Sequence, residues 1–412
     1  MKAAVIGGGA AGFFLAIELK KIMPEMDVTI FEAKRKCLAK VEISGGGRCN
    51  CSNSFQDITD LKNAYPRGFN LMKRALKHFS NEDTYQWFEN HGVKLVTQKD
   101  GCVFPASQDS HSIINCFLSE AHHLGISVKL SSPVEKISTE REKLTLYLQD
   151  STTPLSFDFV AVTVGGQSRN NEMLTMLEKM GHKIEQPVPS LFTFNIKDQG
   201  LRNLMGLVVE NAITSIPGTN MHSRGDLLIT HWGFSGPATL KLSSYAARYL
   251  YNHNYSSPII INWSGLSNAQ DVETVIDTII KQNGSKLLAN SHPFNLPNRL
   301  WQYLLTKAEQ KPDKRWTELS KKGFNKIVNI LTNDEYTIDS RSTYKDEFVT
   351  CGGVSLESVN SKTMESKVTK GLFFAGEIID IDGITGGFNF QAAWTTAYIA
   401  AHGISNTLSF MG

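Results

Sequence analysis

Short apolar runs alternate with longer amphipathic segments through the N-terminal part of the chain. The runs at 2–6, 93–97, 126–130 and 157–164 are short and rich in β-branched residues, which is typical of buried strands. The segments 13–23, 71–79, 82–90 and 110–124 space their apolar residues as helices do. Strands that alternate with helices form a parallel sheet, so this part predicts an α/β fold with a small antiparallel excursion at 133–148.

The pattern changes in the middle of the chain. Candidate strands at 192–196, 207–213, 225–229 and 258–263 have hairpin-like spacing and predict a small antiparallel barrel or sheet. Three helices are predicted at 271–281, 296–308 and 316–331, with prolines between them. The main sheet is then expected to resume with strands at 348–354 and 372–377, followed by a helix at about 392–401. The predicted domains are 1–188 and 343–412, interrupted by a module at 189–342 with a β part at about 189–265 and a helical part at about 268–332.

A glycine turn joins the first strand to the first helix. Gly7 permits a tight turn, Gly9 lets a pyrophosphate approach the backbone, and Gly12 lets the helix pack closely on the strand. The next strand, 27–31, ends at Glu32, twenty residues after Gly12, where a carboxylate can bind a ribose hydroxyl. Strand, turn, helix and acidic residue together favour dinucleotide binding over a glycine-rich turn without a ligand.

Other glycine-rich loops follow later strands. The stretch 44–50 (SGGGRCN) offers backbone donors and one cation, Arg48, where a flexible surface loop is the alternative. Gly165 and Gly166 end one apolar strand, which is equally typical of an ordinary turn or of a ligand at the sheet edge. Near the C-terminus, a strand ends in Gly376 and Glu377, and a further glycine-rich loop opens the last helix. This repeats the chemistry of the N-terminus, because a helix start presents free N–H groups and a positive dipole end.

Two helix starts at opposite ends of one chain can serve one long, doubly charged ligand, and we infer FAD. The first turn is expected to hold the pyrophosphate, and the C-terminal loop the ribityl chain and the pyrimidine side of the flavin. No second GxGxxG follows a strand in the middle of the chain, so a resident nicotinamide domain is not expected. The absence of a CxxxxC after the first acidic strand argues against a disulfide reductase.

Composition limits the classes of partner that the chain is expected to bind. The chain of 412 residues carries 42 basic and 40 acidic residues, so its net charge of +2 favours neither nucleic acid nor an anionic membrane. The chain opens directly into the first strand and has no apolar stretch as long as a membrane span, so a cytoplasmic location is expected. Six cysteines without zinc or CxxC spacing read as reduced thiols, and no metal is expected. Oligomeric state is not indicated.

The motifs resemble the BaiN-like flavoproteins, also called the aminoacetone oxidase family. The matching stretches are GGGAAG at 7–12, ISGGGRCN at 43–50, VFP at 103–105, THWGFSGPA at 230–238, VTCGGV at 349–354, TMESK at 363–367 and GLFFAGEIIDIDGITGGFNFQAAW at 371–394. The resemblance implies a two-dinucleotide-binding-domain flavoprotein fold, which is an FAD-binding Rossmann-like domain with an inserted β-barrel plus helical module. It also implies an adenine contact at Val134. The motifs and the resemblance together give the expected FAD contacts: Gly7, Gly9, Ala10, Ala11, Gly12, Glu32, Ala33, Lys40, Ser44, Gly45, Gly46, Gly47, Arg48, Cys49, Asn50, Val134, Gly165, Gly166, Gly376, Glu377, Asp380, Gly386, Gly387, Phe388, Asn389 and Gln391.

The chain departs from that family at two places. Only the lysine of a family Gly-Arg-Lys remains, as Lys40, and residues 167–170 replace a glycine- and tyrosine-rich loop. The sequence gives little indication of catalytic residues. His231, in a loop with Trp232 and Gly233, is a weak candidate proton donor, and a purely structural histidine is the alternative. No obligatory thiol role is expected for Cys49 or Cys51.

The predicted function is that of an FAD-dependent oxidoreductase that transfers a hydride between flavin and a small organic substrate. NAD(P)H, binding transiently, or O2 is the expected redox partner. The alternative is a non-redox or RNA-linked FAD-binding protein, and the near-balanced charge argues against RNA.

Overall fold

The chain forms two compact units. The computed structural model describes residues 1–140, 143–149, 151–166, 171–341 and 349–409, with backbone alone for 408 and 409. One unit comprises residues 1–188 together with 349–412, and the other comprises residues 189–348. The loop at 167–170 that departs from the family, and position 348 of the strand expected at 348–354, lie outside the described residues.

A parallel sheet organises the first unit. Its strand order is β19-β10-β1-β2-β6, with β1 at Lys2–Ile6, β2 at Asp27–Phe31, β6 at Ser127–Lys129, β10 at Phe159–Val162 and β19 at Leu372–Phe374. Ile6 at the end of β1 lies opposite Phe31 and Val162, and Val162 lies opposite Phe374. The carboxyl ends of four strands therefore meet at one edge, as the alternating pattern predicts.

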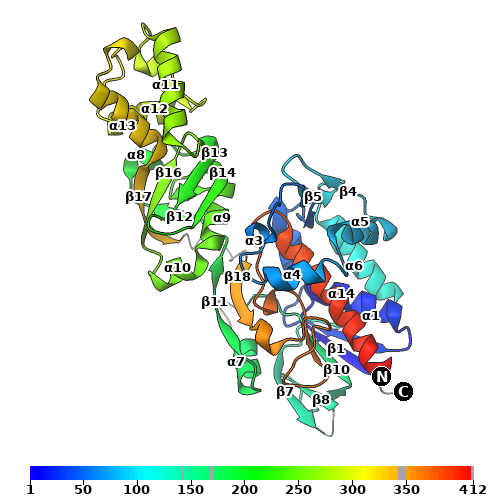
Figure 1. Ribbon diagram of the computed structural model, residues 1–412. Helices are drawn as coiled ribbons and strands as arrows, with labels where there is room; N and C mark the ends of the chain where they lie inside the picture. The colour runs from blue at the N-terminus through cyan, green and yellow to red at the C-terminus, as the bar shows by residue number, and fades with distance from the viewer. Residues whose placement is uncertain (141–142, 150, 167–170, 342–348, 410–412) are drawn as a thin grey trace. The chain divides into compact units, whose positions relative to one another are not determined.

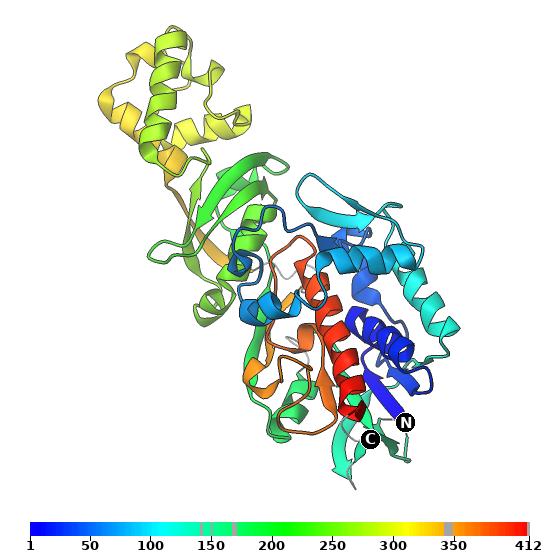
Figure 2. The same cartoon turned by 45° about the vertical axis from the view of Figure 1, so that its right-hand side comes forward.

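Two helices that are far apart in sequence lie side by side on this sheet. Both views show α1 (Ala10–Ile22) next to α14 (Phe388–Ser409) (Figures 1 and 2). Phe14 of α1 packs against Trp394 of α14, with ring centroids 5.6 Å apart. The sequence analysis placed the start of the last helix at about 392, which is four residues late, because Gly387 with φ of +91° lets the helix begin at once.

Smaller elements complete the first unit. Its other helices are α2 (Ala39–Ile43), α3 (Leu61–Ala64), α4 (Phe69–Ala75), α5 (Asn81–Asn90), α6 (His111–His123) and α7 (Glu172–Lys179). One small sheet has the order β3-β5-β4, formed by Ser52–Asn53, Cys102–Pro105 and Leu95–Thr97. Another has the order β7-β8-β9, formed by Val134–Glu140, Lys143–Leu148 and Leu155–Phe157, and it is the expected antiparallel excursion.

One predicted strand belongs to a different sheet. β18 (Val349–Val354) was expected to resume the parallel sheet, but it pairs with β11 (Ile184–Ser190). The reason is close backbone packing at its two glycines. A Cβ on Gly352 would lie 2.3 Å from the Gln186 carbonyl oxygen, and one on Gly353 would lie 2.3 Å from that of Ile378. The two glycines therefore lie inside β18, where their lack of a side chain allows this close packing.

The second unit is a closed barrel that carries helices. The barrel order is β12-β15-β14-β13-β16-β17, and Figure 2 shows the helices of residues 269–332 gathered at one end of the barrel. The strands are β12 (Phe194–Ile196), β13 (Val208–Ser215), β14 (His222–Ile229), β15 (Gly233–Ser235), β16 (Ser257–Asn262) and β17 (Asp334–Arg341). The helices are α8 (Gln199–Arg202), α9 (Pro237–Tyr245), α10 (Ala247–Asn252), α11 (Ala269–Asn283), α12 (Asn298–Lys307) and α13 (Lys321–Thr332).

Two details of this unit differ from expectation. The sequence analysis did not list β17, which closes the barrel by pairing with both β16 and β12. The helix expected at 316–331 is divided into a short 3-10 turn at Trp316–Glu318 and α13. Ser320 causes the break, because its side chain caps α13 by accepting the Gly323 N–H at 3.1 Å. None of the helices in the described part of the chain has both the length and the apolar character needed to cross a membrane.

Candidate functional site

The first glycine turn lies at the carboxyl edge of the parallel sheet. The Gly7 amide donates to the Phe31 carbonyl at 2.8 Å, and Thr163 at the end of β10 donates its hydroxyl to the Gly7 carbonyl at 2.9 Å. A Cβ on Gly12 would lie only 2.0 Å from the Gly7 oxygen and 2.7 Å from the Thr163 hydroxyl. Gly12 therefore has the close-packing role that the fingerprint predicts. Thr163, which the sequence analysis missed, fixes the turn from the neighbouring strand.

The start of α1 is open for an anion. Gly9 occupies the N-cap position with φ of −94°, and no side chain caps the helix. The first amides of a helix have no intrahelical acceptor, so those of Ala10 and Ala11 are available to a ligand. A Cβ on Gly9 would meet no described atom within 4 Å. Free backbone donors beside open space fit a pyrophosphate.

Glu32 is held beside this turn. One carboxylate oxygen accepts the Gly8 amide at 2.8 Å, and the other accepts the Lys34 amide at 2.9 Å. The Ser132 amide donates to the Glu32 carbonyl at 2.8 Å, which brings the segment leading to Val134 next to the end of β2. Ala33 is exposed at the same corner. The expected ribose and adenine contacts thus come from adjacent segments.

The SGGGRCN loop follows α2 and begins at Ser44. Gly45, Gly46 and Gly47 have φ of +56°, +71° and +85°, a region in which residues with a Cβ are strained. A Cβ on Gly46 or Gly47 would meet nothing within 4 Å, so this backbone also faces open space. Arg48 is held within the loop region, because it donates to the Gly45 carbonyl at 3.1 Å and to Gln108 at 3.2 Å. Its guanidinium stacks 4.1 Å from the Phe104 ring centroid.

The two cysteines of this loop region are unsuited to thiolate chemistry. Cys49 and Cys51 are both fully buried. Burial raises the pKa of the Cys49 thiol to about 12 and raises that of Cys51 well above its usual range. At neutral pH both side chains are therefore protonated. The expected cofactor contact of Cys49 stays a prediction.

The C-terminal glycine loop packs against this same region. A Cβ on Gly387 would lie 2.0 Å from the Ser52 carbonyl and 2.8 Å from the Asn50 side chain, and the Asn53 amide donates to the Gly386 carbonyl at 2.9 Å. The loop therefore sits directly beside the segment after SGGGRC, with the start of α14 at Phe388. A Cβ on Gly376 would lie 2.8 Å from that of Ala11 in α1, so both ends of the chain meet here. We call the glycine turn, the SGGGRCN loop and the C-terminal glycine loop the cradle, and their contact with one cofactor stays a prediction.

Two polar side chains of α14 are used within the protein. Asn389 makes hydrogen bonds to the backbone of Gly383, accepting its N–H at 2.8 Å and donating to its carbonyl at 2.9 Å. Gln391 is fully buried, and it accepts the hydroxyls of Ser52 at 2.6 Å and Thr84 at 3.0 Å. Their expected cofactor contacts stay predictions. Gln391 is enclosed by the protein, and its backbone amide donates to the Gly387 carbonyl at 3.0 Å.

Glu377 contacts three other segments of the chain, through Thr350, Lys40 and Gly166. It accepts the Thr350 amide at 2.7 Å and pairs with Lys40 at 2.7 Å. A Cβ on Gly166 would lie 2.2 Å from the Thr350 hydroxyl and 2.7 Å from the Glu377 carboxylate. Lys40, the residue retained from the family motif, therefore lies beside Gly165, Gly166 and Gly376. Thr350, which lies in β18, was not identified as a site residue from the sequence.

Asp382, close to the expected contact Asp380, has a structural partner. It is fully buried and forms a two-pronged ion pair with Arg67, whose Nε donates at 2.6 Å. This carboxylate raises the pKa of the Arg67 guanidinium above its usual range despite burial. Asp380 is half-buried and its amide donates to the Val354 carbonyl at 2.9 Å. The pair anchors the loop on which Asp380 and the glycines stand.

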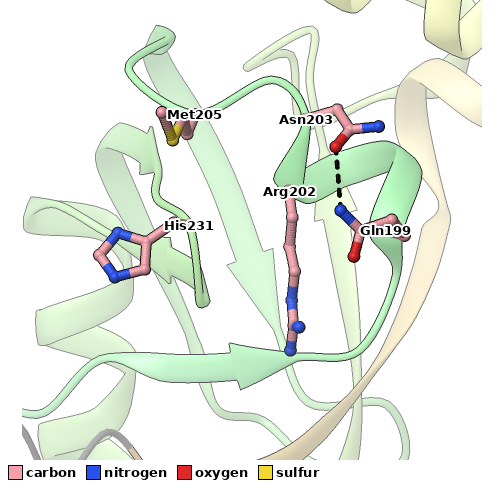
Figure 3. Close-up of a pocket in the computed structure, with 5 residues that line it drawn as sticks. All are labelled: Gln199, Arg202, Asn203, Met205 and His231. Atoms are coloured by element: carbon pink, nitrogen blue, oxygen red, sulfur yellow. Dashed lines mark hydrogen bonds between the residues drawn. The ribbon is translucent and has the colours of Figure 1, made fainter.

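His231 belongs to the second unit. It lies exposed in the turn between β14 and β15, with its ring 4.3 Å from the Trp232 ring. Figure 3 shows it at a hollow of the barrel surface with Arg202 and Met205, and this hollow is also lined by Gln199 and Asn203. Arg202 is anchored there because its Nε donates to the Ile196 carbonyl at 2.6 Å. The hollow offers polar side chains, and the proton-donor role of His231 stays a prediction.

Comparisons with known proteins identify the family of this chain. The family described as HI0933-like protein Rossmann domain matches residues 1–403. A ribosomal RNA dihydrouridine synthase of Haemophilus influenzae is 30% identical over 410 residues, which covers 97% of this chain and 98% of that protein. A 3-dehydro-bile acid delta(4,6)-reductase of Clostridium scindens is 23% identical, covering 96% of this chain and 97% of that protein.

A solved structure shares the fold across the whole chain. It is the 3-ketosteroid delta1-dehydrogenase of Sterolibacterium denitrificans in complex with 1,4-androstadiene-3,17-dione, with a TM-score of 0.50 at 12% identity. The match covers 98% of this chain and 99% of that one. At this identity the likeness concerns the fold alone. It agrees with the predicted FAD-binding Rossmann-like fold, which the architecture and the family match confirm.

Proposed function

The chain belongs to the HI0933-like Rossmann-domain family of FAD-binding oxidoreductases, and from that premise we propose that it reduces uridine to dihydrouridine in ribosomal RNA. The observation that carries this proposal is the 30% identity to a ribosomal RNA dihydrouridine synthase, which extends over 97% of the chain. Because nearly all of both proteins is covered, the likeness includes the inserted unit as well as the cofactor cradle.

The names of the two relatives describe one type of chemistry. Uracil has a carbon-carbon double bond, C5=C6, conjugated to the C4 carbonyl, and a 3-oxo steroid with a double bond at C4 has the same arrangement. Such a bond is reduced by adding a hydride to the carbon remote from the carbonyl and a proton to the carbon next to it. A fold that performs one of these reductions needs a different substrate surface, but no different redox chemistry, to perform the other.

The reaction balances with a nicotinamide as reductant. Uridine gains a hydride at C6 and a proton at C5, and NAD(P)H leaves as NAD(P)⁺. Bound FAD supplies the hydride chemistry between these two partners. The chain's part would be to hold that cofactor: the α1 start and Glu32 would bind its nucleotide half, and the SGGGRCN and Gly386-Gly387 backbones would bind its flavin half.

A proton donor is also needed at C5. Burial encloses the thiols of Cys49 and Cys51 and raises their pKa, which makes them weak acids, so we assign this role to His231. An imidazole can give up a proton near neutral pH. The polar hollow that it lines with Arg202 supports an encounter with a polar substrate. A His231→Asn variant should then bind FAD and be reduced by NAD(P)H normally, yet transfer the hydride to RNA much more slowly.

The test is direct. Purified protein loaded with FAD is incubated anaerobically with NADPH or NADH and with ribosomal RNA prepared from cells that lack the gene. The RNA is digested to nucleosides, and dihydrouridine is measured by mass spectrometry as a gain of two hydrogens on uridine. Formation of dihydrouridine only when both nicotinamide and active protein are present supports the proposal. Reduced flavin that leaves every uridine unchanged contradicts it.

A second candidate function is reduction of a small conjugated enone. The 23% identity to the bile acid reductase over 96% of the chain favours it, and it matches the expectation of a small organic substrate. If the substrate is a small enone, the expectation from the sequence that the protein binds no nucleic acid also stays a prediction. Adding a 3-oxo-4-ene steroid to the same anaerobic assay separates the two, because each substrate reoxidises the flavin only if it is accepted. Reoxidation by O2 alone would favour an oxidase, and no reduction by any nicotinamide would favour a non-redox role.

A further inference from the structure

Positive charge is concentrated in one part of the second unit. Residues 281–326 contain ten of the chain's 42 basic residues but only three of its 40 acidic residues. The remainder of the chain is therefore acidic overall, and the net charge of +2 conceals the difference. A local excess of lysine and arginine is the usual electrostatic footprint of a nucleic-acid contact.

Backbone hydrogen bonds bring this charge together. The Leu288 amide donates to the Lys314 carbonyl at 2.8 Å, and the Trp316 amide donates to the Lys286 carbonyl at 3.2 Å. Leu287 and Arg315 form an antiparallel bridge between the same two segments. Below them Trp301 and Trp316 stack with ring centroids 6.2 Å apart, both fully buried. Segments 25 or more residues apart in sequence thus share one rigid surface.

The cations on this surface are left for solvent or a partner. We call the side chains of Lys286, Lys311, Lys314, Arg315, Lys321 and Lys322 the basic face. Five of the six are exposed and Lys314 is half-buried, and none makes an ion pair within the described parts of the chain. By contrast, the neighbouring Lys307 and Lys326 are paired with Asp334 and Glu309.

Building on the proposed function, we propose that the basic face binds the phosphate backbone of the ribosomal RNA substrate. Unpaired lysines on a rigid support gain affinity by displacing condensed counterions from phosphates, and this requires no particular base sequence. An anionic membrane fits less well, because no large apolar side chain is exposed within 281–326, whereas interfacial helices insert such residues. The face thus supplies affinity for the nucleic acid, while chemistry belongs to the flavin site.

The experiment compares charge reversals in the full-length, FAD-loaded protein. The test variant is K311E/K314E/K321E/K322E. Its matched control is K73E/K77E/K94E/K99E, which changes the net charge equally at four exposed lysines of the first unit. Binding to a ribosomal RNA fragment is titrated at several salt concentrations, and flavin content and the rate of flavin reduction by the nicotinamide are measured in parallel.

We expect the test variant to bind the RNA at least about tenfold more weakly than the control, with a shallower dependence of affinity on salt. Flavin content and its reduction should equal those of the wild type, and dihydrouridine formation should fall through KM more than kcat. Equal RNA affinity in test and control variants, while the wild type still forms dihydrouridine, would overturn the basic face but not the proposed function. Wild-type protein that neither binds nor reduces RNA would overturn both. The test variant is also compared with the control for binding to acidic lipid vesicles and to an acidic protein. If its affinity for these falls as much as its affinity for RNA, the result also counts against the proposal.

Discussion

The two regions that we propose to bind ligands differ in what they are made of. The proposed FAD cradle of the first unit consists mainly of backbone: glycines at 45–47 and 386–387 with positive φ, and a start of α1 that carries no side-chain cap. The basic face of the second unit consists of long, flexible, charged side chains on a stiff support. The first arrangement suits a ligand of fixed shape, since its donors are in place before binding. The second suits a long polyanion, whose affinity adds up over interchangeable contacts.

The difference predicts how each region responds to a single substitution. In the cradle, one added methyl group should abolish binding where backbones touch. In the basic face, one lost charge should matter little. Five experiments on variants of the two units test this contrast.

Gly12→Val should have the largest effect. Its first added carbon would lie 2.0 Å from the Gly7 carbonyl, so the turn and α1 cannot both keep their places. We expect the purified variant to contain less than about a tenth of the wild-type FAD. The measurement is the ratio of flavin to protein absorbance, together with the melting temperature of the apoprotein. A yellow, normally melting variant would show that the close approach is not needed.

Asp382→Ala tests the support of the C-terminal loop rather than its contacts. It leaves the buried Arg67 guanidinium without its carboxylate, and breaking a buried pair costs about 3–5 kcal/mol. We expect a fall of that size in the free energy of unfolding, measured by urea denaturation of the apoprotein. Lys326→Ala is the control, because its pair with Glu309 is on the surface and should cost under about 1 kcal/mol.

Gly9→Ala sharpens the contrast, because this glycine is free of steric contacts. Its φ of −94° suits any residue, and the added carbon would meet no described atom within 4 Å. The apoprotein should therefore melt like the wild type, whereas FAD affinity should fall about tenfold or more, because a pyrophosphate must approach that backbone. Isothermal titration of apoprotein with FAD measures this. Unchanged affinity would mean that the phosphates lie elsewhere.

Acidification should loosen the first unit through His182. This imidazole is buried, its Nδ1–H donates to the Leu177 carbonyl, and its Nε2 hydrogen-bonds with the Ser366 hydroxyl. Burial lowers its pKa below the usual 6.5. The unfolded chain then takes up the proton more readily, so stability is lost as pH falls from about 6.5 toward the lower folded pKa. Thermal release of FAD should shift to lower temperature in that window. In the His182→Asn variant the temperature of FAD release should depend less on pH. If it changes with pH as steeply as in the wild type, His182 is not the cause.

Lys314→Ala should have the smallest effect. Removing one of several phosphate contacts is expected to weaken RNA binding by only about threefold at moderate salt. Fluorescence anisotropy with a labelled RNA fragment measures the change. A loss as large as that of the fourfold reversal would mean that this lysine makes a specific contact, and the two regions would then be less different than proposed.

Sequence reasoning was most successful where function depends on backbone. A position that must be glycine is written in the sequence itself, so the turn at 7–12 and the loop at 45–47 could be read directly. Partners contributed by distant strands could not. Thr163, Thr350 and Arg67 become relevant only because the fold brings them to Gly7, Glu377 and Asp382, and their own sequence surroundings carry no such signal.

Two other features were hidden for different physical reasons. β17 has an alternating pattern of buried and exposed residues, but only Asn333 separates it from the end of α13. The basic face was hidden by averaging, because an acidic remainder cancels it in the total charge. Net charge therefore indicates which partners a protein can bind only when it is calculated for each structural unit separately.

The most direct test of the whole account is a single turnover. FAD-loaded protein is reduced anaerobically with one equivalent of nicotinamide and then mixed with ribosomal RNA that lacks dihydrouridine. The account predicts that the visible absorbance of oxidised flavin returns and that one dihydrouridine appears for each flavin reoxidised. Flavin that stays reduced in the presence of RNA, but is reoxidised by a conjugated steroid enone, would contradict it.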